Sequence, residues 1–155
     1  MITIRQYLAT DRYVFEQLVR YYYEENKITP PSQDMVLSTI GFYIAFPQCG
    51  SIYIFEFENE IVGYSIVSNV WSNRYGKLSY LIDEFYVLKE YRRRKIENNH
   101  IEYLIKQEGV YGIGIRAEKN RSISKTILKL LKFYEDKDKL YTRVLIHERI
   151  KHEFK

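Results

Sequence analysis

The chain has 155 residues, of which 46% are hydrophobic and 28% are charged, and its formal net charge is +4. This length predicts a single domain spanning residues 1–155, and the mild positive charge allows an anionic ligand or an acidic partner without requiring nucleic acid. One cysteine, Cys49, excludes an internal disulfide and a C-x-x-C metal site. No apolar run approaches the ~20 residues of a membrane span, and the N-terminus lacks the apolar segment of a signal peptide. We therefore expect no membrane contact and a cytoplasmic location.

The first third of the chain predicts a strand and two helices. Apolar and polar residues alternate from Ile2, as in a half-buried strand. Thr10 or Asp11 can cap the helix that follows, and Ser32 can cap a second helix that Pro47 ends. The inward positions of the first helix are Val14, Phe15, Leu18, Val19 and Tyr22.

The remaining elements alternate between strands and helices. Residues 51–58 and 61–70 are two alternating runs joined by a short turn, which predicts a hairpin. The elements after it are predicted to be a strand at 77–88, a helix at 98–107, a strand at 110–118, a helix at 120–132 and a strand at 140–147, with a short extra strand near Tyr134 left open. This order predicts a mixed α/β protein.

A family resemblance is carried by residues 81–106, which read as a strand, a basic loop and a helix. The order strand, E-Y-R, helix resembles the GCN5-related N-acetyltransferases, whose loop follows the pattern Arg/Gln-x-x-Gly-x-Gly/Ala. The run from Asp83 to Arg92, DEFYVLKEYR, fits the diamine (spermidine/spermine-like) subgroup without a gap. The resemblance implies a mixed, mostly antiparallel central sheet flanked by helices. It also implies transfer of an acetyl group from acetyl-CoA to a primary amine, on a small molecule or a protein lysine, and it allows a homodimer.

The resemblance further implies where acetyl-CoA would bind, between the fourth and fifth strands where they splay apart. Main-chain groups of Phe85, Tyr86 and Val87 would line the pantetheine arm, and Asn120 would lie beside the cofactor. A helix that follows a strand presents unpaired N–H groups, which suit an anion. The residues around the pyrophosphate would be Arg92, Arg93, Arg94, Lys95, Ile96, Glu97 and Asn98.

The chain departs from the family pattern at three positions, two of them in the loop. Arg92 fits its first residue, but Lys95 and Glu97 stand where the family has glycine or alanine, and Ile127 stands where it has a thiol-protonating tyrosine. A carboxylate ~4 Å from a phosphate costs roughly 4 kcal/mol at an effective dielectric near 20. Glu97 in a first helical turn would instead gain ~0.3–1 kcal/mol from the helix dipole with no ligand present.

Two acidic residues, Asp83 and Glu84, match the acidic pair on the fourth strand of the diamine enzymes and are the candidate catalytic bases. Because successive strand residues face opposite sides, we expect only one of them to face a given cleft, and Asp83 is favoured. The alternative is a surface carboxylate or a partner for Arg92. Tyr134 or Tyr141 would protonate the thiol only if the backbone brings one to the cleft.

Two functions therefore remain open on the sequence. The first is an acetyl-CoA-dependent N-acetyltransferase. The second is a non-catalytic pseudoenzyme, in which the same scaffold binds another protein and the basic loop meets an acidic partner. The short RRRK cluster gives only thin support to nucleic-acid binding. The three histidines lack ligand spacing, so we expect no metal site and place them on the surface or on helix faces: His100, His147 and His152.

Overall fold

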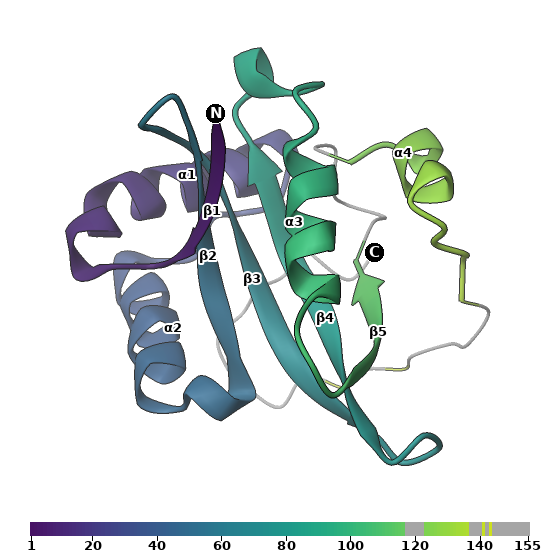
Figure 1. Ribbon diagram of the computed structural model, residues 1–155. Helices are drawn as coiled ribbons and strands as arrows, with labels where there is room; N and C mark the ends of the chain where they lie inside the picture. The colour runs from purple at the N-terminus through teal and green to yellow at the C-terminus, as the bar shows by residue number, and fades with distance from the viewer. Residues whose placement is uncertain (117–122, 137–140, 142, 144–155) are drawn as a thin grey trace.

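A five-stranded sheet forms the centre of the molecule, with the strands in the order β1-β2-β3-β4-β5 (Figure 1). The structure is a computed structural model that describes residues 1–116, 123–136, 141 and 143. Neighbouring strands from β1 to β4 are antiparallel, and β5 runs parallel to β4. The strands are β1 (Ile2–Gln6), β2 (Gly50–Phe57), β3 (Glu60–Ser72), β4 (Lys77–Val87) and β5 (Val110–Ile115). The predicted mixed, mostly antiparallel sheet is confirmed.

Helices cover both faces of this sheet (Figure 1). On one face lie α1 (Arg12–Glu25) and α2 (Gln33–Ala45), and on the other lies α3 (Ile96–Ile105). The short α4 (Lys125–Leu130) packs against the core on the α3 side. Three 3-10 helices connect the elements: η1 (Ala9–Asp11), η2 (Pro47–Cys49) and η3 (Lys89–Tyr91).

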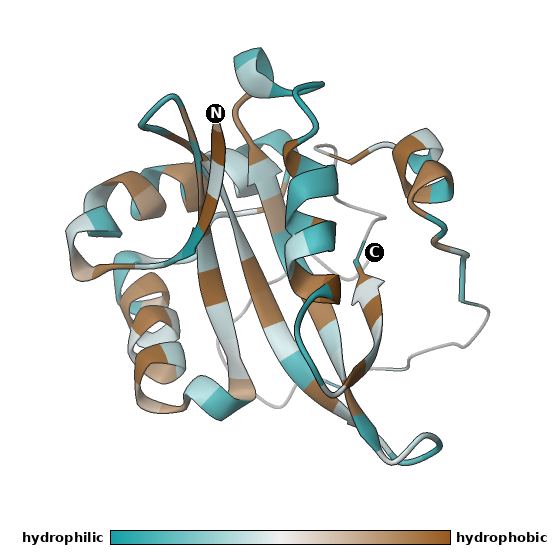
Figure 2. Cartoon of the chain, viewed as in Figure 1, coloured by the Kyte–Doolittle hydropathy of each residue, from teal (hydrophilic) through white to brown (hydrophobic). Residues whose placement is uncertain are grey.

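The alternation of side chains along each strand divides the apolar interior into two cores. On β2, Ile52 and Ile54 face α1 and α2, whereas Tyr53 and Phe55 face α3. Figure 2 shows the strands largely hydrophobic between the helices, while the side of α3 turned to the viewer is hydrophilic. The sheet is therefore buried on both faces, and each helix contributes one apolar stripe to it.

Element boundaries differ from the sequence prediction mainly in the last quarter of the chain. Helix α3 begins two residues earlier than expected, at Ile96. Helix α4 is shorter than the predicted 120–132 because the Ser124 hydroxyl caps it by accepting the Ile127 amide. Tyr134 lies in irregular backbone, so the optional extra strand there is wrong. The predicted strand at 140–147 lies outside the described residues apart from positions 141 and 143.

Candidate functional site

A bulge in β4 determines how the two candidate carboxylates point. Ile82 pairs with Val67 on β3, and Glu84 pairs with Ile66, so Asp83 is an extra residue in the register. Strict alternation would send neighbouring carboxylates to opposite faces. With the bulge, both contact hydroxyl groups on the α1/α2 side of the sheet. Strict alternation therefore does not hold at the bulge, and the two carboxylates share one side of the sheet; of the two, Glu84 lines a pocket there and Asp83 does not.

Glu84 is held by two tyrosines. The hydroxyl of Tyr23 on α1 donates to Oε1 at 2.6 Å, and the hydroxyl of Tyr64 on β3 donates to Oε2 at 2.7 Å. Burial raises the pKa of Glu84, and the two hydrogen bonds, which favour the ionised form, offset this only in part. Sequence reasoning missed both partners. Tyr23 had a signal in the run of three tyrosines, whereas nothing singled out Tyr64.

Asp83 is part of a polar network that ties β5 to α2. The Nε of Arg116, the first residue after β5, donates to Oδ1 at 2.8 Å, and the Ser68 hydroxyl donates to Oδ2. Ser68 in turn shares a 3.0 Å hydrogen bond with the Tyr43 hydroxyl on α2. The ion-pair partner of Asp83 is thus Arg116 and not Arg92. Asp83 is ion-paired with a cation, whereas the hydrogen-bond partners of Glu84 are neutral hydroxyls, so Glu84 becomes the better candidate base.

Strands β4 and β5 part just beyond this network. The last residues in their register are Ile82 and Ile115, whereas β4 continues for five more residues. The amide of Leu88 still donates to β3, at 2.9 Å. Hydrogen bonding alternates along an antiparallel pair, so the main-chain groups of Phe85 and Val87 point toward the side that β5 has left. Phe85 and Val87, two of the three residues predicted to line the pantetheine arm, therefore direct main-chain groups away from β3, and the Val87 carbonyl accepts from the Nε of Arg92.

Arg92, the residue that fits the first position of the loop pattern, folds back onto the protein. Its two terminal nitrogens donate to both carboxylate oxygens of Glu25 at 2.8 and 2.7 Å, and its Nε donates to the Val87 carbonyl at 2.8 Å. The guanidinium also lies 5.6 Å from the ring centroid of Tyr86. Such a bidentate, charge-assisted pair is geometrically specific. It joins the end of α1 to the end of β4.

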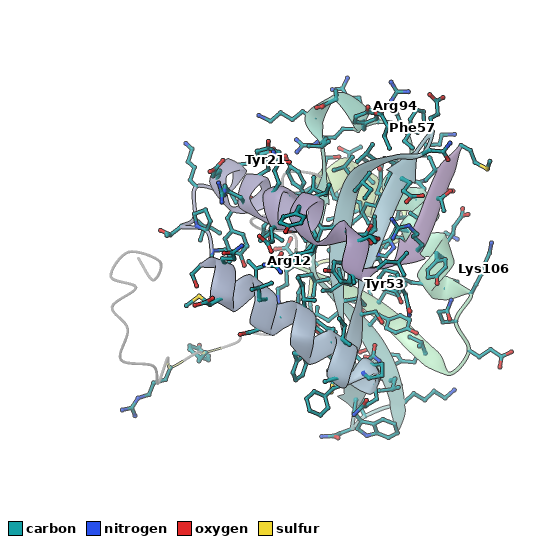
Figure 3. All side chains as sticks on the ribbon, turned by 90° about the vertical axis from the view of Figure 1, so that its left-hand side faces the viewer. Arg12, Tyr21, Tyr53, Phe57, Arg94 and Lys106 are labelled. Atoms are coloured by element: carbon teal, nitrogen blue, oxygen red, sulfur yellow. The ribbon has the colours of Figure 1, made fainter. Side chains whose placement is uncertain are left out.

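The remaining basic residues of the loop are exposed and differ in what they contact. Arg94 lies over the ring of Phe57 at 4.6 Å, and both lie at one end of the molecule in Figure 3. Arg93 and Lys95 have left-handed backbone, with φ of 64° and 62°. Glycine favours this conformation. The loop therefore has a glycine-like backbone at position 95 even though the residue is lysine.

The loop leads directly into α3, whose first turn has no side-chain cap from Lys95. The amides of Ile96, Glu97 and Asn98 precede the first helical hydrogen bond, so they form the positive end of the helix dipole. The side chain of Glu97 is only 7% exposed. It lies on the inward stripe of α3 that continues through His100, Ile101 and Leu104.

His100 lies on a helix face, one of its two predicted places, but this is the inward face of α3 and the residue is fully buried. Its Nε2 lies 2.8 Å from the Ser65 hydroxyl, and its ring packs against Tyr53 and Phe55 at centroid distances of 5.3 and 5.0 Å. Its Nδ1 has no hydrogen-bond partner among the described residues. Burial lowers the pKa of His100 to about 3, which makes the ring neutral at pH 7.

The residues predicted to lie near the thiol and beside the cofactor are described only in part. Ile127 lies on α4, partly buried against the α3-side core, and has no proton to donate. Tyr134 and Tyr141 are 89% and 86% exposed, so neither is enclosed in a cleft. Asn120 lies outside the described residues, as do His147 and His152.

Over residues 1–116, 123–136, 141 and 143, no three His, Cys, Asp or Glu side chains gather as metal ligands. Within those same ranges, every helix is too short or too polar to cross a bilayer.

Comparison with known proteins gives a clear answer about the fold. No family model and no curated protein matches the chain. Among solved structures, a possible acetyltransferase from Clostridium difficile 630 is 22% identical, with a TM-score of 0.79 over 95% of this chain and 99% of that one. A predicted acetyltransferase from Clostridium acetobutylicum, solved with acetyl-CoA, is 16% identical, with a TM-score of 0.72 over 92% and 96%. The chain has the GCN5-related N-acetyltransferase fold.

The same fold also occurs in a protein that is not named as an acetyltransferase. A transcriptional regulator from Bacillus halodurans C-125 is 15% identical, with a TM-score of 0.73 over 93% of this chain and 100% of that one. Likeness at such low identity concerns the backbone, so the activity must be argued from the side chains.

Within the acetyltransferase fold, the main chain of this protein suits a CoA-like ligand better than its side chains do. The parted strands, the left-handed loop and the uncapped α3 match what the family resemblance requires. The buried side chain of Glu97 does not, because it brings a carboxylate into the first turn of the helix. Arg92 is committed to Glu25, and the other loop cations, Arg93, Arg94 and Lys95, are exposed.

Proposed function

We propose that this protein is an N-acetyltransferase that moves an acetyl group from acetyl-CoA to a primary amine. The observation that carries the proposal is the position of Glu84. Its carboxylate lies one residue beyond the bulge of β4, next to the point where β4 and β5 part. A proton acceptor thus lies two residues beyond the last β4–β5 pair that the described residues form, and acyl transfer to an amine requires such an acceptor.

The cofactor would be held mainly by backbone. The main-chain groups of Phe85 and Val87 face the gap, and the amides of the first turn of α3 suit a pyrophosphate. Arg93 and Lys95 would add positive charge from the loop. When bound, acetyl-CoA supplies the acyl group as a thioester.

Glu84 would act on the acceptor. An amine must lose its ammonium proton before its lone pair can attack, and Glu84 would accept that proton. Burial raises the pKa of Glu84 above its ordinary value, toward neutrality, which makes its carboxylate a stronger base. The nitrogen loses its second proton as the amide forms, and the departing sulfur gains one. Because Ile127 has no hydroxyl, we assign this transfer to water.

The side chain of Glu97 favours a second candidate, a non-catalytic scaffold that binds another protein. A buried carboxylate in the first turn of α3 interacts favourably with the helix dipole by itself, and it repels a phosphate. With Arg92 held by Glu25, the loop also lacks its expected inward cation. This candidate predicts that the wild-type chain does not bind acetyl-CoA.

Titration calorimetry with acetyl-CoA distinguishes the two candidates. The transferase predicts saturable binding by the wild type and a higher melting temperature with ligand, because a ligand of the native state stabilises it. Glu97→Gln keeps the volume and removes the charge, so it should tighten binding. The gain has an upper limit of roughly 4 kcal/mol, the repulsion of one charge pair at ~4 Å and an effective dielectric near 20.

Glu102→Gln is the matched control, since Glu102 is exposed on the same helix. It should leave the affinity unchanged. No binding by the wild type at millimolar acetyl-CoA rejects the transferase. If Lys95→Gly with Glu97→Gly then creates binding, the scaffold reading is supported. Equal affinity of this double variant and a wild type that already binds would reject the scaffold.

A further inference from the structure

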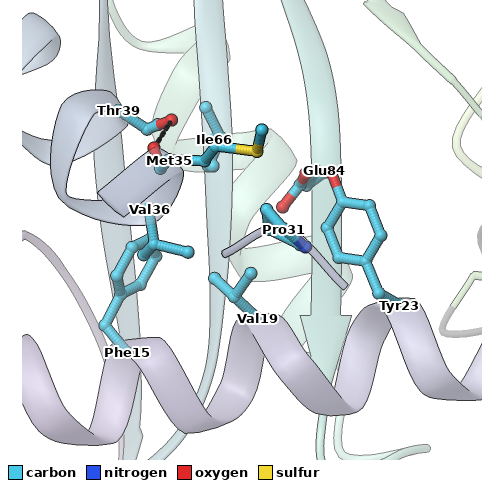
Figure 4. Close-up of a pocket in the computed structure, with 9 residues that line it drawn as sticks. All are labelled: Phe15, Val19, Tyr23, Pro31, Met35, Val36, Thr39, Ile66 and Glu84. Carbon is cyan, nitrogen blue, oxygen red and sulfur yellow. Dashed lines mark hydrogen bonds between the residues drawn. The ribbon is translucent and has the colours of Figure 1, made fainter. Parts of the chain in front are cut away.

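A small pocket opens between α1, α2 and β4, on the same side of the sheet as Glu84 (Figure 4). Its volume is about 100 Å³. Its walls are mostly apolar and consist of Phe15, Val19, Pro31, Met35, Val36 and Ile66.

The pocket is lined by one carboxylate, Glu84, and by two hydroxyl groups, those of Tyr23 and Thr39. Tyr23 donates its hydroxyl to Glu84, and Thr39 donates its own to the main-chain oxygen of Met35 at 3.1 Å. Glu84 is the one ionisable acid among the nine lining residues. A carboxylate offers about four acceptor positions, and the two tyrosine hydroxyls on Glu84 leave capacity for an ammonium group.

Four acids flank lining residues in the sequence; Asp83 and Glu16 are already paired, and Glu24 and Asp34 are exposed. Asp83 accepts from Arg116 and Ser68. On α1, Glu16 accepts from Arg12 at 2.8 Å and from Gln33 at 3.0 Å. A second positive charge on a ligand would therefore lie against apolar wall or compete with existing cations, and an unpaired charge loses hydration there without compensation.

On this basis, and resting on the proposed transferase function, we propose that the pocket selects a primary ammonium group at the end of a short, uncharged apolar stem. A small n-alkylamine and a lysine side chain both present this chemistry. A diamine does not, because its far end carries a second charge. The sequence resemblance to the diamine enzymes would then not extend to the acceptor.

The test measures amine binding directly, without cofactor, by following amide chemical shifts of the full chain at pH 7.5. The ligands are n-butylamine, 1,4-diaminobutane and Nα-acetyl-lysine methylamide. The first two have the same carbon stem and differ in the terminal charge. We expect n-butylamine to bind at least tenfold more tightly than 1,4-diaminobutane, and the lysine derivative shows whether the mouth admits a peptide backbone.

Three variants complete the experiment. Glu84→Gln removes the charge and keeps one acceptor oxygen, while the other tyrosine hydroxyl can accept from the new amide group. It should abolish binding of n-butylamine, whereas Glu102→Gln on the opposite face should not change it. Met35 is 46% exposed, which places it at the pocket mouth. Met35→Glu adds a carboxylate there and should shift the preference toward 1,4-diaminobutane.

Equal or tighter binding of 1,4-diaminobutane by the wild type would overturn the inference. No binding of either amine, or unchanged binding by Glu84→Gln, would overturn it as well. Since the measurement uses no cofactor, its outcome is separate from that of the acetyl-CoA titration. A chain that binds acetyl-CoA and prefers the diamine would keep the proposed function and lose this inference. A chain that does not bind acetyl-CoA and prefers n-butylamine would lose the proposed function and keep this inference.

Discussion

Burial of His100 makes the stability of this protein depend on pH in a specific direction. The pKa of His100 is lowered to about 3 by burial, whereas an unfolded histidine titrates near 6.5. As the pH falls below 6.5, the unfolded chain binds a proton at this position and the native chain does not. Native-state stability is therefore complete above pH 6.5 and is lost progressively toward pH 3.

The size of the effect follows from the distance between the two pKa values. Each pH unit in this window costs about 1.4 kcal/mol. Between pH 7.5 and pH 5.0 the chain should lose about 2 kcal/mol through His100 alone. This is a large fraction of the stability of a typical domain.

Urea denaturation at the two pH values, for the wild type and for His100→Gln, isolates this contribution. Glutamine keeps a nitrogen near the position of Nε2 for the Ser65 hydroxyl and does not titrate. Glu84 changes stability in the opposite direction, since its pKa is raised in the native state, but both proteins retain it. The difference between the two proteins should shrink by about 2 kcal/mol at pH 5.0. An equal loss of stability in both would refute a buried, neutral His100.

Three further predictions concern the loop and the sheet. A double-mutant cycle on Arg92→Ala and Glu25→Ala should give a coupling energy of about 1.5–3 kcal/mol in the free energy of unfolding. The reason is that the ion pair is bidentate and its two side chains are only 20% and 13% exposed. A coupling energy near zero would contradict this prediction. Gly63→Ala should lower the free energy of unfolding by about 3 kcal/mol, because the added Cβ would overlap a main-chain oxygen of β4. Gly112→Ala is the control: no described atom lies within 4 Å of the added Cβ, so urea denaturation should show no change. Lys95→Gly should stabilise by up to about 1 kcal/mol because it relieves a left-handed backbone; destabilisation would mean that the lysine side chain makes a compensating contact.

The order of elements was predictable because local patterns determine it. The alternation of apolar residues in β2 and the apolar stripe of α1, which repeats every 3.6 residues, can be recognised without knowing what each element packs against. Ser32 caps α2 as expected, since its hydroxyl accepts a hydrogen bond from the Met35 amide. The resemblance at 83–92 added the fold, which the solved structures confirm. The end of the chain was harder, since α4 is short and its apolar positions are few.

The candidate site was predictable only in part, because its side chains come from distant segments. The sequence indicated Asp83 and Glu84 as candidate bases, but it did not indicate the hydrogen-bond and ion-pair partners that distinguish the two. Arg116 lies 33 residues from Asp83, and Tyr23 lies 61 residues from Glu84. No local pattern reports such contacts.

The sequence by itself determined which residues form strands and helices, and that Lys95 and Glu97 replace the small residues of the loop. Only the tertiary structure decided that the bulge turns Asp83 and Glu84 to one face, and that His100 lies in the core. The physical reason is that periodicity fixes direction within a regular element. A single extra residue in a strand, or the packing of a helix against a sheet, depends on neighbours that are remote in sequence.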